Sequence, residues 1–372
     1  MKKEKVLLGM SGGVDSSVAA MLLQKQGYEV IGAFMKNWSD TKNKLTGECQ
    51  WKEERRVAQK IADRLGIKLI TLDFENQYKK LVVDEMFKKY KKGITPNPDI
   101  DCNKEIKFPL LIKEAKKLGI NLIATGHYVR NKKTRNKYQL VRAKDEMKDQ
   151  SYFLYTIRQN ELKHCLFPIG ELTKQQVREI AEKNNFPNYA KKSTVGICFI
   201  GKINLKQFLQ QRIKPKKGKI MNPEGKQIGE HDGIYYYTIG QRIGPRFGIE
   251  ISYTLANQDG KDHTKWYVAK KDAKTNTIIA APEVHPLNFR KEIIIQDFYL
   301  IDEKKENYKN ESHKVLARIR QVGELLPSKL FFEKGKFKLT LDKAITGVAD
   351  GQAVVLYKGE KVLGGGTIFA CE

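Results

Sequence analysis

The fold of this chain is predicted first from Val6–Met35, VLLGMSGGVDSSVAAMLLQKQGYEVIGAFM. An apolar run opens it and a turn rich in glycine and serine follows, after which Val14, Val18 and Met21 recur at helical spacing. Gly27 then stands where a helix ends on a residue at positive φ, and a second apolar run begins. This order of strand, turn, helix and strand predicts the first unit of a parallel sheet.

The same alternation continues along the first half of the chain. Further strands are expected at residues 68–74 and 121–128, with helices around Ile61, over residues 78–93 and after a capping box that begins at Thr173. Nearly continuous apolar strands indicate a sheet that helices cover on both faces. We therefore expect a doubly wound α/β fold whose ligands lie at the carboxyl ends of the strands.

From about residue 204 the pattern changes to short apolar runs separated by turn residues, for example over residues 231–240. Such runs predict small β-rich barrels. We expect three domains: an α/β domain at 1–203, a central β-rich domain at 204–285 and a carboxyl-terminal barrel-like domain at 286–372.

The chain is strongly basic. Its 69 Lys and Arg outnumber 43 Asp and Glu among 372 residues, which leaves a net charge of +26. Basic clusters at residues 88–93, 131–137 and 214–219 are typical of a surface that meets phosphates. The alternative is a lysine-rich composition spread over the whole surface.

The chain shows neither a signal peptide nor the run of about 18 apolar residues that a membrane span needs. We therefore expect a cytoplasmic protein with no membrane partner. Its five cysteines form no C-x-x-C pair, which argues against a zinc site and against a secreted disulfide framework.

The turn GMSGGVDSS, residues 9–17, has the composition of a phosphate-binding loop, but it matches neither the Walker A pattern nor G-x-G-x-x-G. Gly12 and Gly13 let backbone N–H groups approach a phosphate closely, Ser11 and Ser16 add hydroxyl donors, and a helix amino terminus follows. Asp15 is interpreted as a carboxylate beside a Mg²⁺ ion or at the helix amino terminus.

Two cysteines lie in segments that suggest chemistry. Residues 94–108 predict a proline-stiffened loop, in which Cys102 follows Asp99 by three residues. Asn103 and Glu105 are candidates for the start of the next helix, and lysines near that start would favour the Cys102 thiolate. The alternative for Cys102 is an ordinary small apolar residue. Cys198 lies in STVGICFIG, residues 193–201. Its apolar neighbours are typical of a buried strand cysteine, whereas the flanking glycines suggest a mobile segment.

The loop SGGVDS between a strand and a helix resembles the signature of the PP-loop ATP pyrophosphatases, which cleave ATP between its α and β phosphates. With motifs from end to end, the chain resembles the tRNA-specific 2-thiouridylase family. Those motifs are NPDIDCNKEIKF, ATGHY, KDQSYFLY, STVGICFIG, GQRIG, ARIRQ and LGGGTI. The resemblance implies a PP-loop domain followed by two β-rich domains.

The resemblance also implies the reaction. ATP, with Mg²⁺, would adenylate the C2 oxygen of the wobble uridine in tRNA. A persulfide on Cys198, received from a sulfur-carrier protein, would attack that carbon. Cys102 would then release 2-thiouridine by attacking the sulfur linkage, which leaves a Cys102–Cys198 disulfide, and Asp99 would act as the acid or base.

Site residues carry over by position, and no metal ligand is among them. The ATP-binding residues would be Gly9, Met10, Ser11, Gly12, Gly13, Val14, Asp15, Ser16, Met35 and Gly126. The tRNA-binding residues would be Asn97, Pro98, Asp99, His127, Lys148, Asp149, Gln150, Arg318 and Gln352.

Two rival functions are weighed against this one. A PP-loop ligase acting on a small molecule would explain the loop, but it leaves the two cysteines and the basic β-rich domains without a task. A non-catalytic RNA-binding protein with a relic loop would explain the charge, but the loop and both cysteine motifs are intact.

Overall fold

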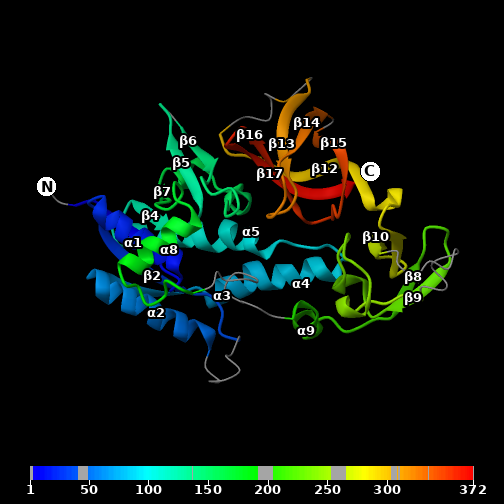
Figure 1. The fold of residues 1–372 in the computed structure, drawn as a ribbon, viewed down its shortest axis with the longest axis horizontal. Coiled ribbons are helices and arrows are strands. Elements are labelled where there is room, and N and C mark those ends of the chain that lie inside the picture. Colours follow the sequence, from blue (N-terminus) through cyan, green and yellow to red (C-terminus); the bar gives the residue numbers. More distant parts are fainter. Residues whose placement is uncertain are drawn as a thin grey trace.

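The structure is a computed structural model that describes residues 3–40, 49–135, 137–191, 204–252, 265–302, 308, 311–333 and 335–371. The described residues form three sheets (Figure 1). Helices gather around the first sheet, whereas the other two belong to β-rich parts of the chain.

The described strands of the first sheet are all parallel. They are β1 (Lys5–Gly9), β2 (Glu29–Lys36), β3 (Lys68–Asp73), β4 (Leu122–Thr125) and β7 (Cys165–Leu166). Their order across the sheet is β3-β2-β1-β4-β7, so the chain reverses direction across the sheet between β1 and β4. Ligands bind beyond the carboxyl ends of parallel strands at such a reversal. The predicted doubly wound fold is confirmed.

Helices cover both faces of this sheet. The helices α1 (Val14–Lys25), α2 (Gln50–Leu65) and α8 (Lys174–Lys183) share a core with the side chains of Val6 and Leu8. On the other face, α6 (Phe108–Lys117) and α7 (Gln159–Leu162) pack with Leu7. Alternate residues of β1 therefore enter two cores, which explains the unbroken apolar run. Within the described ranges, no helix is long and apolar enough to cross a membrane.

A second group of helices leads from the first sheet toward the β-rich parts of the chain (Figure 1). They are α3 (Glu75–Tyr78), η1 (Lys79–Val83), α4 (Asp84–Lys91), α5 (Pro98–Cys102), η2 (Asn103–Lys107), the short η3 (Ser151–Leu154) and α9 (Leu205–Gln210). The segments η1 and η2 are π-helical turns.

The predicted loop over residues 94–108 is wrong beyond Asn97. A helical stretch begins at Pro98 and continues through α5, η2 and α6 to Lys117. Pro98 occupies the first helical position, where its fixed φ suits a helix and its missing N–H costs nothing. The Asn97 side chain accepts a hydrogen bond from Ile100 N (3.3 Å) and caps the helix. Cys102 therefore lies inside a helix and not in a loop.

The second sheet has the order β10-β11-β8-β9. Its strands are β8 (Gly218–Met221), β9 (Gln227–His231), β10 (Trp266–Asp272) and β11 (Thr277–Pro282). The expected strand over residues 231–240 is wrong after His231, because η4 (Ile234–Tyr236) is a 3₁₀ turn. Its tyrosine hydroxyls donate to the backbone carbonyls of Lys214 and Ile213, each at 2.5 Å, which ties the turn to the chain before β8.

The third sheet closes into a barrel through six described strands, because β12 pairs with both β15 and β17. The strands are β12 (Phe289–Leu300), β13 (His313–Arg318), β14 (Leu326–Glu333), β15 (Lys336–Thr346), β16 (Ala353–Lys358) and β17 (Lys361–Cys371). The short turns η5 (Pro245–Phe247) and η6 (Pro286–Asn288) precede it. A hairpin of the first domain, β5 (Val129–Lys133) and β6 (Tyr138–Arg142), extends this sheet where Val141 pairs with Lys361.

The loop after β1 makes close backbone contacts that require glycine at two positions, Gly12 and Gly126. Gly12 has φ +71°, and a Cβ there would lie 2.3 Å from the Glu54 carbonyl oxygen of α2. A Cβ at Gly126, just after β4, would lie 2.7 Å from Ser16 N and 2.8 Å from the Asp15 carbonyl carbon. These neighbours are backbone atoms that cannot move aside. The carboxyl end of β4 and the first turn of α1 are therefore in direct backbone contact.

We predict that Gly126→Ala displaces the first turn of α1. If that turn binds ATP, as the sequence predicts, the apparent affinity for ATP should fall by roughly one to two orders of magnitude. Equilibrium binding of ATP measures this effect. Gly119→Ala is the control for general destabilisation, because Gly119 has φ +69° and alanine strains the backbone there, while the added Cβ has no atom within 4 Å. Equal ATP affinity in the two variants would contradict the predicted contact.

Candidate active site

The loop between β1 and α1 is held by its own hydrogen bonds. Ser16 Oγ donates to the Gly13 carbonyl (3.0 Å) and accepts from Ser11 N (3.3 Å). The buried Asn188 side chain donates to the Gly12 carbonyl (3.0 Å). Among the described side chains none caps α1, whose N-cap is Gly13. The first-turn N–H groups of a helix without a cap are suited to an anion.

Asp15 has a partner that the sequence did not predict. Lys174 Nζ, at the first residue of α8, lies 2.5 Å from Asp15 Oδ1, and the Tyr128 hydroxyl donates to the same oxygen (2.8 Å). Lys174 is 9% exposed, and its Nζ also lies 5.6 Å from the centre of the Tyr128 ring. Burial, followed by the Asp15 charge, raises the pKa of Tyr128, so its hydroxyl remains a donor. The loop therefore acquires from α8 the lysine that its own sequence lacks.

The sequence did not predict Lys174 as a site residue, because its partner Asp15 lies 159 residues away along the chain. One local signal was present. A lysine in the first turn of a helix is unfavourable beside the positive end of the helix dipole. Such a lysine, buried directly after the Thr173 cap, needs a negative partner elsewhere in the fold.

The structure brings the predicted ATP-binding residues together at one edge of the sheet. Gly9 ends β1, residues 10–16 follow it, Met35 lies near the end of β2, and Gly126 follows β4. A methyl group at Gly9 would lie 3.7 Å from Met35 Cε, so the Met35 side chain lies over Gly9. These positions share the carboxyl edge where the strand order reverses.

The residues predicted to meet the target base form the start of α5. Asn97 caps the helix, Pro98 begins it, and Asp99 is half-buried in its first turn. Cys102 ends α5 with no exposed surface, among the side chains of an apolar cluster. Asp99 and Cys102 thus lie on one short helix. Cys198 lies outside the described residues.

His127 connects these two groups of residues. It follows Gly126 directly, and its Nε2 lies 3.3 Å from Lys107 Nζ at the end of η2. Its Nδ1 lies 2.7 Å from Thr125 Oγ1, and its ring stacks on Phe108. Burial and then the Lys107 charge hold the pKa of His127 well below its usual range. A neutral His127 therefore joins the end of β4 to the helix that carries Cys102.

The four predicted tRNA contacts at residues 148–150 and 318 have different surroundings. Lys148 is exposed, whereas Gln150 Oε1 accepts from Tyr128 N (2.9 Å). Asp149 has no exposed side-chain surface and lies 2.7 Å from Arg318 Nη1, itself 5% exposed. Asp149 and Arg318 are therefore buried partners across the boundary between the first domain and the barrel.

Gln352 also faces the first domain. Its Nε2 donates to the carbonyls of Thr95 (3.0 Å) and Pro96 (3.3 Å), which directly precede the Asn97 cap. The structure thus places this residue of the barrel against the segment that begins α5.

Asn37 and Asn103 are two of several buried asparagines with an amide atom that no described residue hydrogen-bonds. Asn37, just beyond β2, is 1% exposed, and within the described part of the chain neither its Oδ1 nor its Nδ2 has a hydrogen-bond partner. Asn103, next to Cys102, donates to the Asp99 carbonyl (3.0 Å), but its Oδ1 has no partner. Buried amides without partners are costly, so both positions are suited to a polar ligand or water.

Three family models match the chain in succession. They are the tRNA methyl transferase HUP domain over residues 4–202, the tRNA methyl transferase PRC-barrel domain over 206–282 and the aminomethyltransferase beta-barrel domain over 290–368. Among solved structures, the chain is similar to a 4-thiouridine synthetase in complex with RNA and ATP, at 16% identity and a TM-score of 0.39. That match covers 56% of this chain and 50% of the other.

Curated relatives match over the full length. A tRNA-specific 2-thiouridylase of Photorhabdus laumondii is 40% identical over 368 residues, which cover 98% of this chain and 97% of the relative. A tRNA-specific 2-thiouridylase of Bacillus subtilis is 40% identical over 376 residues, which cover 98% and 94%. This chain belongs to the family of tRNA-specific 2-thiouridylases.

Proposed function

We propose that this protein synthesises 2-thiouridine in tRNA by activating a uridine with ATP and transferring sulfur from a cysteine persulfide. The observation that carries the proposal is the full-length similarity to tRNA-specific 2-thiouridylases. The rival ligase that acts on a small molecule has no comparable support. The matches extend through both β-rich parts of the chain, for which that ligase has no use.

The loop after β1 is the proposed ATP site. The N–H groups at the start of α1 would bind the phosphates, and Lys174 would add a positive charge beside them. Asp15 and Tyr128 hold the Lys174 ammonium at the loop. Because pyrophosphate leaves as an anion, a fixed cation there would stabilise the charge that develops in the transition state.

A Mg²⁺ ion fits this site only if the phosphates of the nucleotide supply most of its ligands. The described residues contain no group of three or more His, Cys, Asp or Glu that could hold a metal ion. At the loop, Asp15 offers one carboxylate, whose Oδ1 already meets Lys174. Mg²⁺ commonly takes one protein carboxylate together with phosphate and water oxygens. It would neutralise phosphate charge, with Asp15 Oδ2 as the available protein ligand.

The proposed sulfur transfer needs two thiols: Cys198 carries the sulfur, and Cys102 releases the product. The uridine C2 oxygen attacks the α phosphorus of ATP and pyrophosphate leaves. The terminal persulfide sulfur of Cys198, delivered by a sulfur-carrier protein, attacks C2 and AMP leaves. The Cys102 thiolate then attacks Cys198 Sγ, which breaks the S–S bond, releases the thiolated uridine and leaves a Cys102–Cys198 disulfide. An external thiol reduces that disulfide. Asp99 would move the proton at the base.

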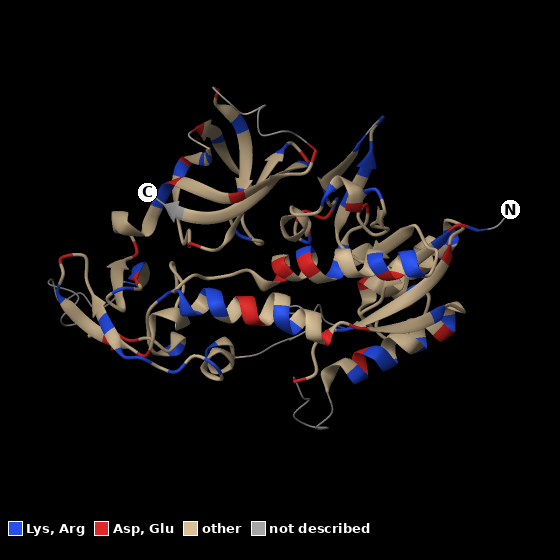
Figure 2. Ribbon diagram, turned by 180° about the vertical axis from the view of Figure 1, so that it is seen from behind, with Lys and Arg blue, Asp and Glu red and all other residues tan. Residues whose placement is uncertain are grey.

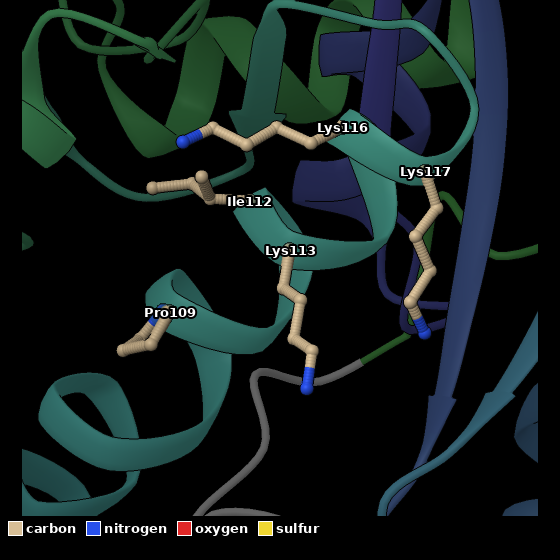
Figure 3. Close-up of a pocket in the computed structure, with 5 residues that line it drawn as sticks. All are labelled: Pro109, Ile112, Lys113, Lys116 and Lys117. Carbon is tan, nitrogen blue, oxygen red and sulfur yellow. The ribbon is translucent and has the colours of Figure 1, made fainter.

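The basic residues are proposed to meet tRNA. Figure 2 shows Lys and Arg on elements of all three sheets and on the helices between them. A surface depression along α6 is lined by three lysines, whose side chains extend from the helix (Figure 3). Because lysine ammonium groups attract phosphates, we assign this depression to contact with the tRNA backbone. The lining residues are Pro109, Ile112, Lys113, Lys116 and Lys117.

We predict that Cys102→Ala and Cys198→Ser each abolish 2-thiouridine formation while the enzyme still releases pyrophosphate from ATP and tRNA. Alanine is chosen at Cys102 because a buried hydroxyl in an apolar cluster would itself be destabilising. Cys49→Ser is the control, since Cys49 has no role in the proposal. Nucleoside and pyrophosphate assays measure both steps. Full turnover by either of the first two variants would show that the two-thiol mechanism is wrong.

We predict that Lys174→Met lowers the rate of pyrophosphate release at saturating ATP by roughly a hundredfold or more, because the fixed cation is lost. Lys174→Arg should retain part of the rate. Lys183→Met is the matched control, because Lys183 is exposed in the last turn of the same helix. Unchanged release by Lys174→Met would remove this residue from the proposed ATP site.

A further inference from the structure

The segment that leads into α5 is enclosed by all three parts of the chain. Thr95 is 7% exposed, and its N–H donates to the Asp350 carbonyl of the barrel (3.1 Å). Its hydroxyl donates to Thr238 Oγ1 in the central part of the chain (3.4 Å). The coil before α5 runs beside the barrel (Figure 1). We call residues 94–96 the junction segment.

The barrel loop at residues 349–352 presses closely on the junction segment. Gln352 Nε2 donates to both the Thr95 and Pro96 carbonyls. Gly351 has φ +87°, and a Cβ there would lie 2.2 Å from Ile94 Cγ2 and 2.8 Å from the Thr95 carbonyl oxygen. The barrel backbone thus approaches this segment as closely as a glycine allows.

A second connection runs through Tyr152, which is 1% exposed. Its hydroxyl donates to the Ala353 carbonyl, the residue after Gln352, at 3.1 Å. Burial raises the pKa of Tyr152, and the neighbouring Asn97 side chain lowers it in part. Asn97 Oδ1 accepts from Ile100 N to cap α5. The barrel therefore meets the start of α5 by two routes: directly at the carbonyls just before the cap, and through Tyr152, which lies beside the Asn97 cap.

We propose that Gln352 is a positioning residue for Cys102, and that the carboxyl-terminal barrel acts on the sulfur-transfer step by fixing where α5 begins. Asp99 and Cys102 lie one and four residues beyond the first residue of α5, so a shift of the helix start moves both. The chemical role given to Cys102 rests on the proposed function, whereas the contacts between the barrel and α5 do not depend on that function.

The first test is alkylation of the free enzyme by iodoacetamide, followed by mass analysis of the Cys102 peptide. Cys102 is fully buried, so labelling reports local opening of α5. Gln352→Ala should speed labelling of Cys102 roughly tenfold, because two hydrogen bonds to the junction segment are lost. Cys165 is an internal control, since it is also buried but lies in β7. Its labelling should not change.

Tyr152→Phe is a second variant, because it removes only the hydroxyl and keeps the buried ring. It should also speed Cys102 labelling. Lys343→Ala, at an exposed position of β15, should leave labelling unchanged. Unchanged Cys102 labelling in both test variants would overturn the inference. Equal acceleration at Cys165 would also overturn it, because the barrel would then stabilise the whole fold and not α5.

The second test separates positioning from tRNA binding. In Gln352→Ala, the rate of 2-thiouridine formation at saturating tRNA should fall roughly tenfold, while the Kd for tRNA changes much less. A weaker Kd with an unchanged saturating rate would make Gln352 only a tRNA contact and would contradict the inference. If the unaltered enzyme forms no 2-thiouridine, the proposed function fails, but the alkylation test still decides the positioning role.

Discussion

The backbone contact between the end of β4 and the first turn of α1 is the constraint on which the rest of the site depends. Gly126 leaves no space for a Cβ against Ser16 and Asp15. The next two residues then carry the site's main connections. His127 contacts Lys107, at the end of the helical segment that continues α5. Tyr128 hydrogen-bonds Asp15, which also pairs with Lys174. One short segment after a strand thus links the proposed nucleotide site to the helix that holds Cys102.

The β-rich domains are integrated with this site rather than appended to it. Cys102 shares an apolar cluster with residues of the central sheet, such as Ile220 and Val268. The buried Asp149–Arg318 pair joins the first domain to the barrel. A buried ion pair is weak evidence for stability, because desolvation offsets its attraction. Here it lies where two domains must meet in one arrangement, and we infer that it specifies that arrangement.

The parallel sheet and the loop could be predicted because they depend on local patterns. Apolar runs, a glycine-rich turn and helical spacing lie within Val6–Met35. The error over residues 94–108 has a physical reason, since proline favours both loops and the first position of a helix. In the structure, the Asn97 side chain caps the helix that begins at Pro98.

The remaining features depend on partners distant in sequence. Lys174 meets Asp15 across 159 residues, and Arg318 meets Asp149 across 169. The position of Lys174 in the first turn of a helix indicates a negative partner, but no local pattern shows which residue that partner is. The family resemblance named Arg318 and Gln352 as tRNA contacts, whereas in the structure both face other parts of the chain. Such contacts between domains could not be predicted from a single sequence without its fold.

Mass analysis of nucleosides from tRNA incubated with the enzyme, ATP, Mg²⁺ and a protein persulfide as sulfur donor measures the proposed activity most directly. We expect 2-thiouridine that depends on ATP, with AMP and pyrophosphate formed in step with it. Conversion of ATP to AMP and pyrophosphate with no thiolated uridine in the tRNA would contradict the proposed activity.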